Sequence, residues 1–404
     1  CPSLPGRSGV ECHFPRRGTM TKHGLIWILA ARAIMTSSRG HPLSAVALAL
    51  GLALAAFPGG AQPAPSSAVT LSWSQALVRR APAWYAAPQA RALAATVLVY
   101  QSPEGGWPKN HDLSHPPSSA AALAELQRSA GNTLDNGATT LPIRFLARVA
   151  TASGDEPCRT GVVRGVDYLL AAQYANGGFP QFFPLRDRGY TPRITYNDNA
   201  MVSALVVLRD VAAGAAPFAF IDPVRRAKAA DAVGRGIDCI LKTQVSQGGK
   251  RTVWCAQHDE TTLAPAWGRA YEPPSLSGSE SVGIVRFLMG IEEPTPEVVA
   301  AIEGAVAWLN AVAIHGIRVE RFFDASGKRD IRVIPDSEAG PLWARFYELG
   351  TDRPLFMGRD SKPVYFLAEI EQERRGGYAY HGTSAASLLA TDYPRWRAKH
   401  KRPS

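Results

Sequence analysis

Two short polar segments place carboxylates beside amides, a combination of side chains that could hold a cation. In one segment Asp135 is followed by Asn136, and in the other Asp198 stands between Asn197 and Asn199. Carboxylate and amide oxygens are the ligands that Ca²⁺ prefers. Each segment also begins an apolar helical stretch, where Asp and Asn are common as N-caps. Capping alone does not explain why an Asn adjoins the Asp both times, yet on chemistry alone the two interpretations have about equal weight.

A second set of residues could bind an acidic sugar. Arginine binds planar carboxylates through two parallel hydrogen bonds. The tight loop 105–110 offers Trp107 as a platform for a sugar ring and Lys109 as a cation, and the loop 266–275 is dense in groups that line sugar clefts. Further arginines lie in the C-terminal part: Arg345, Arg359 and the adjacent Arg374 and Arg375. The structural alternatives, a packed turn with Trp107 in the core, a packed surface loop and solvated arginines, have similar weight.

The elements that must position these residues repeat along the chain. Gln101, Gln173 and Gln244 each follow an apolar helical stretch and precede a pair of glycines, at spacings of 72 and 71 residues. Each period holds a second helical stretch, over residues 135–152, 198–213 and 277–291, and a further helix is expected over 296–312. The best short strand candidates are 316–322 and 330–334. Two helices per period, repeated about three times, predict a mainly α fold, an (α/α)₃ toroid with a cleft at one end.

Composition limits the class of protein. Apolar residues make up 46% of the 404 residues, which excludes disorder for most of the chain. The uninterrupted apolar run 45–57, followed by small residues at 59–61, is typical of a secretory signal peptide and too short to span a bilayer. We therefore expect residues 1–61 to be removed and 62–404 to form one exported domain, secreted or periplasmic.

Charge and cysteine content limit which partners, disulfides and metal sites are expected. The formal charge falls from +10 to +5 without residues 1–61, and no basic run is dense enough for a nucleic-acid-binding stripe. We expect no nucleic acid or membrane partner, and a monomer whose mild positive charge suits an acidic polymer. An oxidising compartment permits one disulfide among Cys158, Cys239 and Cys255, with the last two the nearer pair, and no Cys or His cluster suggests zinc.

Taken together, these motifs resemble those of the pectate lyases of polysaccharide lyase family 10. The resemblance covers most of residues 75–395 in order, which makes it much more specific than any single motif. Its stretches are 105–110 (GGWPKN), 133–140 (TLDNGATT), 165–184, 194–201 (ITYNDNAM), 254–281 and 356–382.

The resemblance implies Ca²⁺-dependent β-elimination of polygalacturonate on an (α/α)₃ toroid. Asp135, Asn136 and Asp198 match the calcium-site motifs of the family. Arg359 matches the arginine that acts as the base on the C5 proton. The positions implied to bind substrate are Trp107, Lys109, Arg269, Tyr271, Arg345 and Arg374.

An arginine base requires a particular environment. The guanidinium pKa lies above 12, so its deprotonation needs help from neighbouring cations such as calcium and the other arginines. The arginine cluster therefore predicts an alkaline optimum.

Three other functions remain as alternatives. A glycoside hydrolase on the same toroid would need two opposed carboxylates, with Glu272 or Glu280 as the acid. A non-catalytic sugar-binding toroid would use Trp107 and Tyr271 without a base. Triterpene cyclases share the Gln and Gly-aromatic repeat, but the chain lacks their Asp-rich acid motif.

Overall fold

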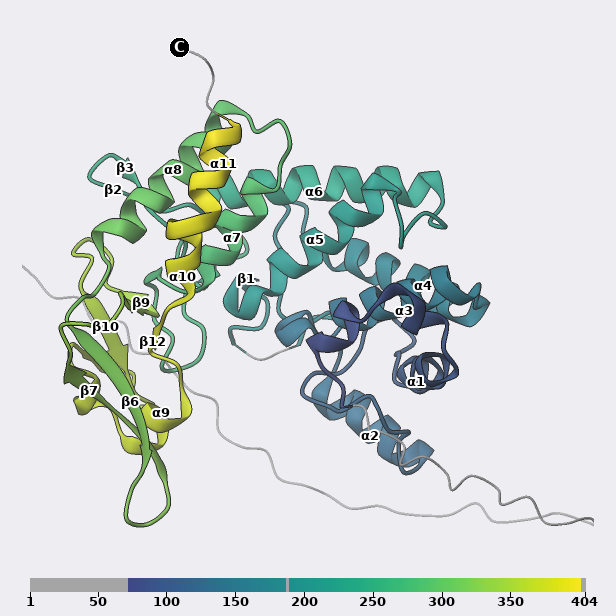
Figure 1. Cartoon of the computed structure of the whole chain (residues 1–404), viewed down its shortest axis with the longest axis horizontal. Helices are drawn as coiled ribbons and strands as arrows, with labels where there is room; N and C mark the ends of the chain where they lie inside the picture. The colour runs from purple at the N-terminus through teal and green to yellow at the C-terminus, as the bar shows by residue number, and fades with distance from the viewer. Residues whose placement is uncertain (1–71, 187–188, 401–404) are drawn as a thin grey trace, which may run out of the picture. The chain divides into compact units, whose positions relative to one another are not determined.

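Two layers of helices make up most of the computed structural model, which describes residues 72–186 and 189–400 (Figure 1). The outer layer contains α1 (Pro88–Val99), α4 (Glu156–Ala172), α6 (Pro223–Thr243) and α8 (Pro296–Ala311). The inner layer contains α3 (Thr140–Ser153), α5 (Ala200–Ala213) and α7 (Glu280–Met289). Helices of each layer contact their neighbours in chain order, and each inner helix contacts the outer helix that follows it. The predicted mainly α fold of repeated helix pairs is confirmed, and closure into a toroid stays a prediction.

The repeated glutamines join one period to the next. Each donates one amide hydrogen bond to a carbonyl of its own loop and another to a carbonyl inside the following outer helix. The loop acceptors are Gly105, Gly177 and Thr252, and the helix acceptors are Gly161, Ala232 and Ala301, all at 2.8–3.0 Å. In the first two periods the first glycine of the pair has a positive φ, and a Cβ there would collide with the carbonyl of Arg164 or Arg235. The period in the sequence is therefore a repeated contact between consecutive outer helices.

Helix starts differ between the two layers. Three outer helices have a capping side chain, with Asp155, Asp222 and Thr295 accepting from the backbone N–H three residues on. The inner helices α3 and α5 have no capping side chain at their first residues, whereas the first N–H of α7 donates to Ser277 Oγ at 3.0 Å. Instead, the turns η3 (Asp135–Gly137) and η4 (Asn197–Asn199) precede α3 and α5. The capping interpretation is thus wrong for Asp135 and Asp198.

These two turns have unusual backbone angles. Asn136, Asp198 and Asn199 have φ values of 53°, 52° and 58°, in the left-handed region that Asn and Asp tolerate better than most residues. The paired Asp and Asn residues therefore serve a turn that directs their side chains, which explains why an amide adjoins the acid in both segments.

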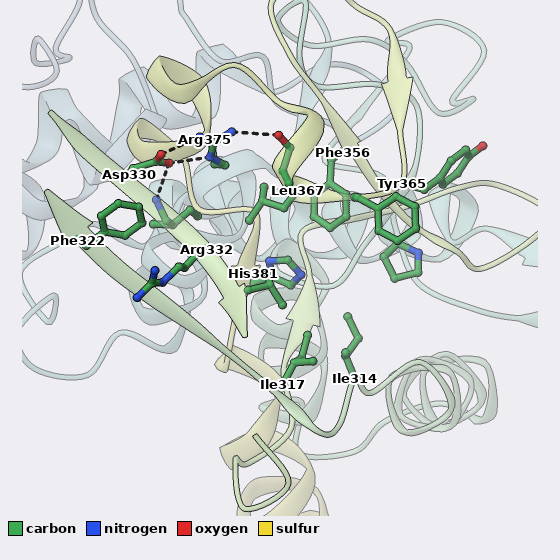
Figure 2. Close-up of a pocket in the computed structure, with 15 residues that line it drawn as sticks. Ile314, Ile317, Phe322, Asp330, Arg332, Phe356, Tyr365, Leu367, Arg375 and His381 are labelled. Atoms are coloured by element: carbon green, nitrogen blue, oxygen red, sulfur yellow. Dashed lines mark hydrogen bonds and ion pairs between the residues drawn. The ribbon is translucent and has the colours of Figure 1, made fainter. Parts of the chain in front are cut away.

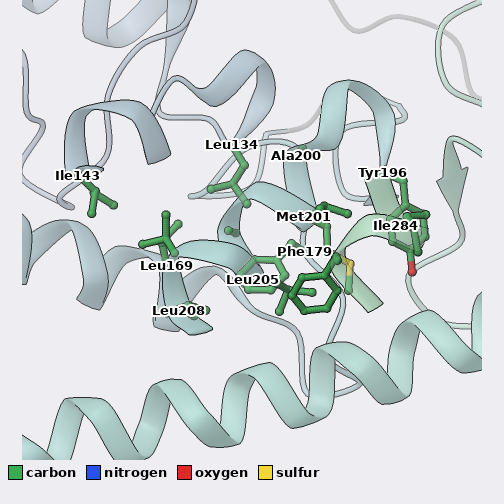
Figure 3. Close-up of a cluster of buried hydrophobic side chains, with 14 of the residues drawn as sticks. Leu134, Ile143, Leu169, Phe179, Tyr196, Ala200, Met201, Leu205, Leu208 and Ile284 are labelled. Carbon is green, nitrogen blue, oxygen red and sulfur yellow. The ribbon is translucent and has the colours of Figure 1, made fainter. Parts of the chain in front are cut away.

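The hydrophobic core lies between the layers. Eight of the fourteen residues of α5 are buried, against six of the twenty-one in α6, so the inner helix of this pair is the more enclosed one. Figure 3 shows Met201 and Leu205 of α5 beside Phe179, which follows the second glycine pair. The second loop thus contributes an aromatic residue to the core next to α5.

The C-terminal part adds short strands to the helical layers. The hairpin β6 (Ile317–Phe323) and β7 (Arg329–Pro335) is antiparallel, with residue 317 opposite 335, which confirms both predicted strands. A second, four-stranded sheet has the order β11 (Pro363–Val364), β10 (Pro354–Met357), β9 (Phe346–Tyr347) and β5 (Leu276–Ser277). Helix α9 (Gln372–Gly377) contacts β7. These pairings bring the loop before α7 together with residues 343–382.

The remaining elements lie outside these two layers and the two sheets just described. They are η1 (Gln75–Arg79), η2 (Pro82–Ala86), α2 (Ala120–Ala130), β1 (Ile194–Thr195), β2 (Ser246–Gln247), β3 (Lys250–Arg251), β4 (Gln257–His258), β8 (Trp343–Ala344), η5 (Leu367–Glu369), β12 (His381–Gly382), α10 (Ser384–Ser387), η6 (Leu388–Asp392) and α11 (Tyr393–Lys399).

Several expectations concern features outside these elements. All described residues belong to one compact unit, 69–404. Cys158, Cys239 and Cys255 are buried free thiols, so the disulfide permitted by the sequence is absent. None of the helices in the described ranges is long and apolar enough to cross a membrane. The predicted signal peptide, 1–61, lies outside the described residues.

Candidate active site

The two acidic helix starts meet in space. The turns η3 and η4 contact each other although their sequences are far apart. Burial raises the pKa of Asp198; the Arg345 guanidinium opposes this shift, and the negative charges of Asp135 and Glu280 add to it. The structure therefore brings three carboxylates, Asp135, Asp198 and Glu280, within electrostatic reach of one another.

Asp135 is almost enclosed and strongly held. Its side chain is 4% exposed, and Oδ2 accepts from Lys109 Nζ at 2.5 Å and from the amide of Gln181 at 2.8 Å. The second oxygen, Oδ1, is buried without a hydrogen-bond partner. The carboxylate therefore has one satisfied oxygen and one free for a ligand. Gln181 was missed by sequence reasoning, although it lies within the stretch 165–184 that carries the family resemblance.

Asp198 is linked to Glu280 through Arg345. The Arg345 Nη2 lies 2.5 Å from Glu280 Oε1, 3.0 Å from Asn197 Oδ1 and 3.5 Å from Asp198 Oδ1. Burial is the largest single influence and lowers the pKa of Arg345, but Glu280, Tyr378, Asp198 and Glu272 together outweigh it and the net pKa is raised. Arg345 is thus a fixed cation beside the three carboxylates Asp135, Asp198 and Glu280, which we call the acid cluster. Asn197 was not singled out from the sequence as a site residue, and its only signal was its place beside Asp198.

All four predicted arginines gather around two tyrosines. Arg269 lies over the ring of Tyr271 at 4.9 Å and over Tyr378 at 5.8 Å, and Arg374 lies over the same rings at 4.5 and 5.3 Å. Arg345 lies 4.8 Å from the ring of Tyr378, and Arg359 lies 5.7 Å from that of Tyr271. We call this group the arginine–tyrosine cluster: Arg269, Arg345, Arg359, Arg374, Tyr271 and Tyr378. Through Arg345 it adjoins the carboxylates.

Glu272 anchors the centre of this cluster. It accepts from Arg269 Nε at 2.9 Å and Nη2 at 2.5 Å, and from the Tyr378 hydroxyl at 2.8 Å. Burial raises the pKa of Glu272, but the hydrogen bonds and charge of Arg269 outweigh burial and the net pKa is lowered. A general acid needs a raised pKa, so this environment weighs against Glu272 as the acid of a hydrolase.

Arg359 lies at the exposed edge of the cluster. Its side chain is 58% exposed, and its Nε and Nη2 donate to Glu373 at 2.8 and 2.9 Å. The hydrogen bond to Glu373 raises the pKa of Arg359. These features weigh against a base role in the state described, and the assignment stays a prediction.

A family model described as pectic acid lyase matches residues 101–389, a range that contains every site residue described above. This chain belongs to that family. The family 10 polysaccharide lyase from Cellvibrio cellulosa is similar in structure, with a TM-score of 0.66 and 35% identity over 81% of this chain and 98% of that one. A mutant of the Cellvibrio enzyme, solved in complex with trigalacturonic acid, matches with a TM-score of 0.65 and 35% identity over 79% and 96% of the two chains. No curated protein matches.

The protein is therefore a polysaccharide lyase of family 10, an enzyme that cleaves a carbon–oxygen bond. The expected family and enzyme class are confirmed by the match over most of the chain.

Two predicted substrate-binding residues of the lyase are internal. Trp107 is fully buried and its ring N–H donates to the Val97 carbonyl at 2.9 Å, so it is no platform for a sugar. Tyr271 is 5% exposed with arginines over its ring, so it positions cations instead of offering a free face. In both cases burial by distant segments, which composition cannot reveal, determines the role.

Two more predicted site residues have protein partners of their own. Lys109 binds Asp135 instead of standing free for a substrate carboxylate. Asn136 is exposed, and its amide donates to Asn110 Oδ1 at 3.1 Å.

The residues of the acid cluster fit a calcium ion in part. Among residues 72–186 and 189–400, no three His, Cys, Asp or Glu side chains are arranged to hold a metal ion. Lys109 and Arg345 are bound to the carboxylates instead. The unpartnered Asp135 Oδ1 and the partly exposed Asp198 are hard oxygen donors of the kind that suits Ca²⁺. A ligand that brings its own carboxylates would complete such a site.

A separate cavity of about 630 Å³ lies beside the β6–β7 hairpin (Figure 2). It is lined mainly by apolar and aromatic residues, including Phe322, Phe356 and Leu367, with His381 facing it. The ion pair between Arg375 and Asp330 borders it. Of the arginines singled out from the sequence, Arg375 alone lines this cavity, and neither Asp135 nor Asp198 does, so the cavity is distinct from the group of carboxylates.

Proposed function

We propose that the lyase cleaves polygalacturonate by Ca²⁺-dependent β-elimination. The observation that carries this proposal is the meeting of Asp135 and Asp198, through Arg345, with the arginine–tyrosine cluster. A site with carboxylates for a cation and arginines for anions suits a polyanion whose charges are carboxylates. The trigalacturonic acid bound by the Cellvibrio relative supports the same substrate class.

In the proposed reaction, removal of the C5 proton and loss of the C4 oxygen leave a double bond between C4 and C5. The proton passes to a base, and the leaving oxygen takes a proton from solvent. The C5 proton is weakly acidic because the adjacent carboxylate is already charged. Bound Ca²⁺ would neutralise that carboxylate and lower the barrier.

We assign the cation to Asp135, Asp198 and Asn136, in agreement with the sequence. The Asp135 Oδ1 is the donor best prepared for it, because it is buried and has no other partner. Three arginines are proposed to bind carboxylates of the substrate: Arg345, Arg269 and Arg374. Their contacts with the tyrosine rings hold the guanidinium groups in position.

The base is proposed to come from the arginine–tyrosine cluster. The family resemblance points to Arg359, which contacts only Tyr271 in that cluster. Arg269 lies deeper, because it also contacts Tyr378 and so reaches the side of the cluster next to Arg345 and Asp198. Burial lowers the pKa of Arg269, but Glu272 outweighs burial and the net pKa is raised. Either arginine must therefore leave its carboxylate partner and be deprotonated before it can accept the C5 proton.

The base assignment is tested by R359A and R269A. The variant that removes the base should lose unsaturated product with little change in substrate affinity, whereas loss of a binding arginine raises KM. A pH–rate profile should rise towards alkaline pH, because the deprotonated fraction of any arginine increases with pH. A maximum near pH 5 would exclude an arginine base.

The function itself is tested by incubating the protein with polygalacturonate and Ca²⁺. We expect the ultraviolet absorbance of a 4,5-unsaturated product, and we expect a chelator to abolish it. New reducing ends without that absorbance would indicate the hydrolase alternative, and neither signal would indicate a sugar-binding protein. The lowered pKa of Glu272 favours the lyase over the hydrolase.

We further propose that the lyase is exported and acts as a monomer. The support for export is the apolar run 45–57 followed by small residues. N-terminal sequencing of the exported protein should begin near Gln62, and light scattering should give the mass of one chain. Retention of residues 1–61 or a dimer mass would contradict these statements.

A further inference from the structure

We propose that Lys109 is an exchangeable counter-ion: it neutralises Asp135 in the free enzyme, competes with Ca²⁺ for that carboxylate, and binds a substrate carboxylate once Ca²⁺ displaces it. The inference rests on the proposed function and deepens it, because it makes calcium and substrate binding depend on one side chain.

The backbone around Lys109 is fixed by the core. Trp107 is fully buried, its ring N–H donates to the Val97 carbonyl, and its backbone N–H donates to Thr139 Oγ1 at 3.2 Å. Pro108 forms a bridge with Asn132. The tight loop therefore holds the start of the Lys109 side chain in place while its end extends to Asp135. This explains why a core tryptophan belongs to a site motif.

The Lys109 ammonium occupies a position that a cation would need. It binds Asp135 Oδ2 at 2.5 Å, while Oδ1 of the same carboxylate is buried and unpartnered. A divalent ion on Oδ1 would lie within a few ångströms of the ammonium, and two like charges at that distance repel strongly where burial limits screening. Calcium binding therefore favours release of Lys109.

Lys109, and not Arg345, is the cation free to exchange. The Arg345 side chain is 11% exposed and has three oxygen acceptors on Asn197, Asp198 and Glu280. The Lys109 side chain is 27% exposed and binds one carboxylate. An ammonium on a flexible stem can turn to a new acceptor, unlike a guanidinium held by three groups.

Linkage then requires reciprocity. If Ca²⁺ releases Lys109 to the substrate, the substrate must increase the affinity for Ca²⁺ by the same factor. The free enzyme is thus kept in a state of low calcium affinity, and the full site forms only when a polyuronate supplies an anion for Lys109.

Calorimetric titration with Ca²⁺ alone, without substrate, tests this directly. K109M should bind Ca²⁺ about tenfold more tightly than the wild type, within the usual range of coupling between sites. K109R keeps the charge and should retain the low affinity. The matched control is K228M, which removes the same charge from an exposed position on α6 and should leave calcium affinity unchanged.

The outcomes separate this inference from the proposed function. Equal or weaker calcium binding by K109M than by the wild type, or no measurable binding by either, would overturn the exchange. K109Q provides a second neutral variant if thermal unfolding shows that K109M is misfolded. In the lyase assay K109M should also show a raised KM. Absence of unsaturated product from the wild type would instead refute the proposed function, whatever the calorimetry shows.

Discussion

At the scale of single residues, Asp198 is a proposed site residue that lowers the stability of the fold. Asp198 lies beside Asp135 and Glu280, and its pKa is raised above the ordinary value of 3.8, chiefly by burial. A raised pKa means that the folded state holds the proton more tightly than the unfolded chain does. Stability is therefore lost as pH rises through the raised pKa, and the charged form at neutral pH weakens the fold. Such a cost is typical of groups retained for function.

D198N should therefore stabilise the protein while inactivating it. We expect a higher melting temperature at neutral pH, because the amide removes one of three crowded negative charges. We expect a loss of about 10²-fold or more in kcat, the usual effect of removing a charge that stabilises the transition state. Thermal unfolding and the lyase assay on the same preparation measure both. A lower melting temperature at pH 7 would show that Asp198 stabilises the fold.

Trp107 gives the opposite case, a site-motif residue with a structural role. W107F replaces the buried indole by a smaller ring and removes its hydrogen bond to the Val97 carbonyl, so the free energy of unfolding should fall by about 1–3 kcal/mol. Denaturant unfolding measures this loss. Trisaccharide affinity per folded molecule should change little. A selective loss of affinity with unchanged stability would restore the sugar-platform interpretation.

At the scale of elements, three outer helices begin with a capping side chain that stabilises them, whereas two inner helices begin with a turn that carries a proposed site residue. Capping side chains begin α4, α6 and α8, whereas the turns before α3 and α5 carry the acids. The other site element, α9, holds Arg374 and is fastened to β7 by the two-point pair of Arg375 and Asp330, at 2.7 Å for each contact. The position of Arg374 in α9 therefore depends on the ion pair that the next residue, Arg375, makes with Asp330.

D330N should loosen α9. The hydrogen bonds of Arg375 lower the pKa of Asp330; the stability that Asp330 contributes is therefore present above its unfolded pKa and lost as pH falls through the lowered folded value. At pH 7 the variant should lose about 1–3 kcal/mol, together with activity that depends on Arg374. E320Q on the same hairpin breaks the more exposed pair with Arg332 and should cost less than about 0.5 kcal/mol. Equal losses in the two variants would contradict the role of Asp330.

At the scale of the whole molecule, the lyase is an array of helix pairs joined by repeated glutamines. The 72- and 71-residue spacing predicted the helix pairs, and strand-like alternation predicted the strands of the hairpin, because both patterns are local properties of the sequence. The sequence offered the burial of Trp107 only as one of two alternatives, and it did not predict the partner of Lys109 or the exposure of Arg359. Each depends on segments far away in the chain, such as the Val97 carbonyl that Trp107 meets.

Q173A should weaken the array as a unit. The variant leaves the carbonyls of Gly177 and Ala232 without their amide donor, and an unmade buried hydrogen bond costs about 1–3 kcal/mol. Because neighbouring helix pairs support each other, the melting temperature should fall in a single transition. Calorimetry would contradict this cooperativity if it showed two separate transitions, or no shift.

Asp135 and Asp198, distant in the sequence, are proposed to serve one reaction centre. The most direct test is the rate of unsaturated product from polygalacturonate for D135A, D198A and the double variant. Residues that act as a unit are strongly non-additive, so each single variant should lose about 10²-fold or more and the double variant little beyond the worse single one. Near-wild-type activity in either single variant, or losses that multiply fully in the double variant, would contradict a shared centre.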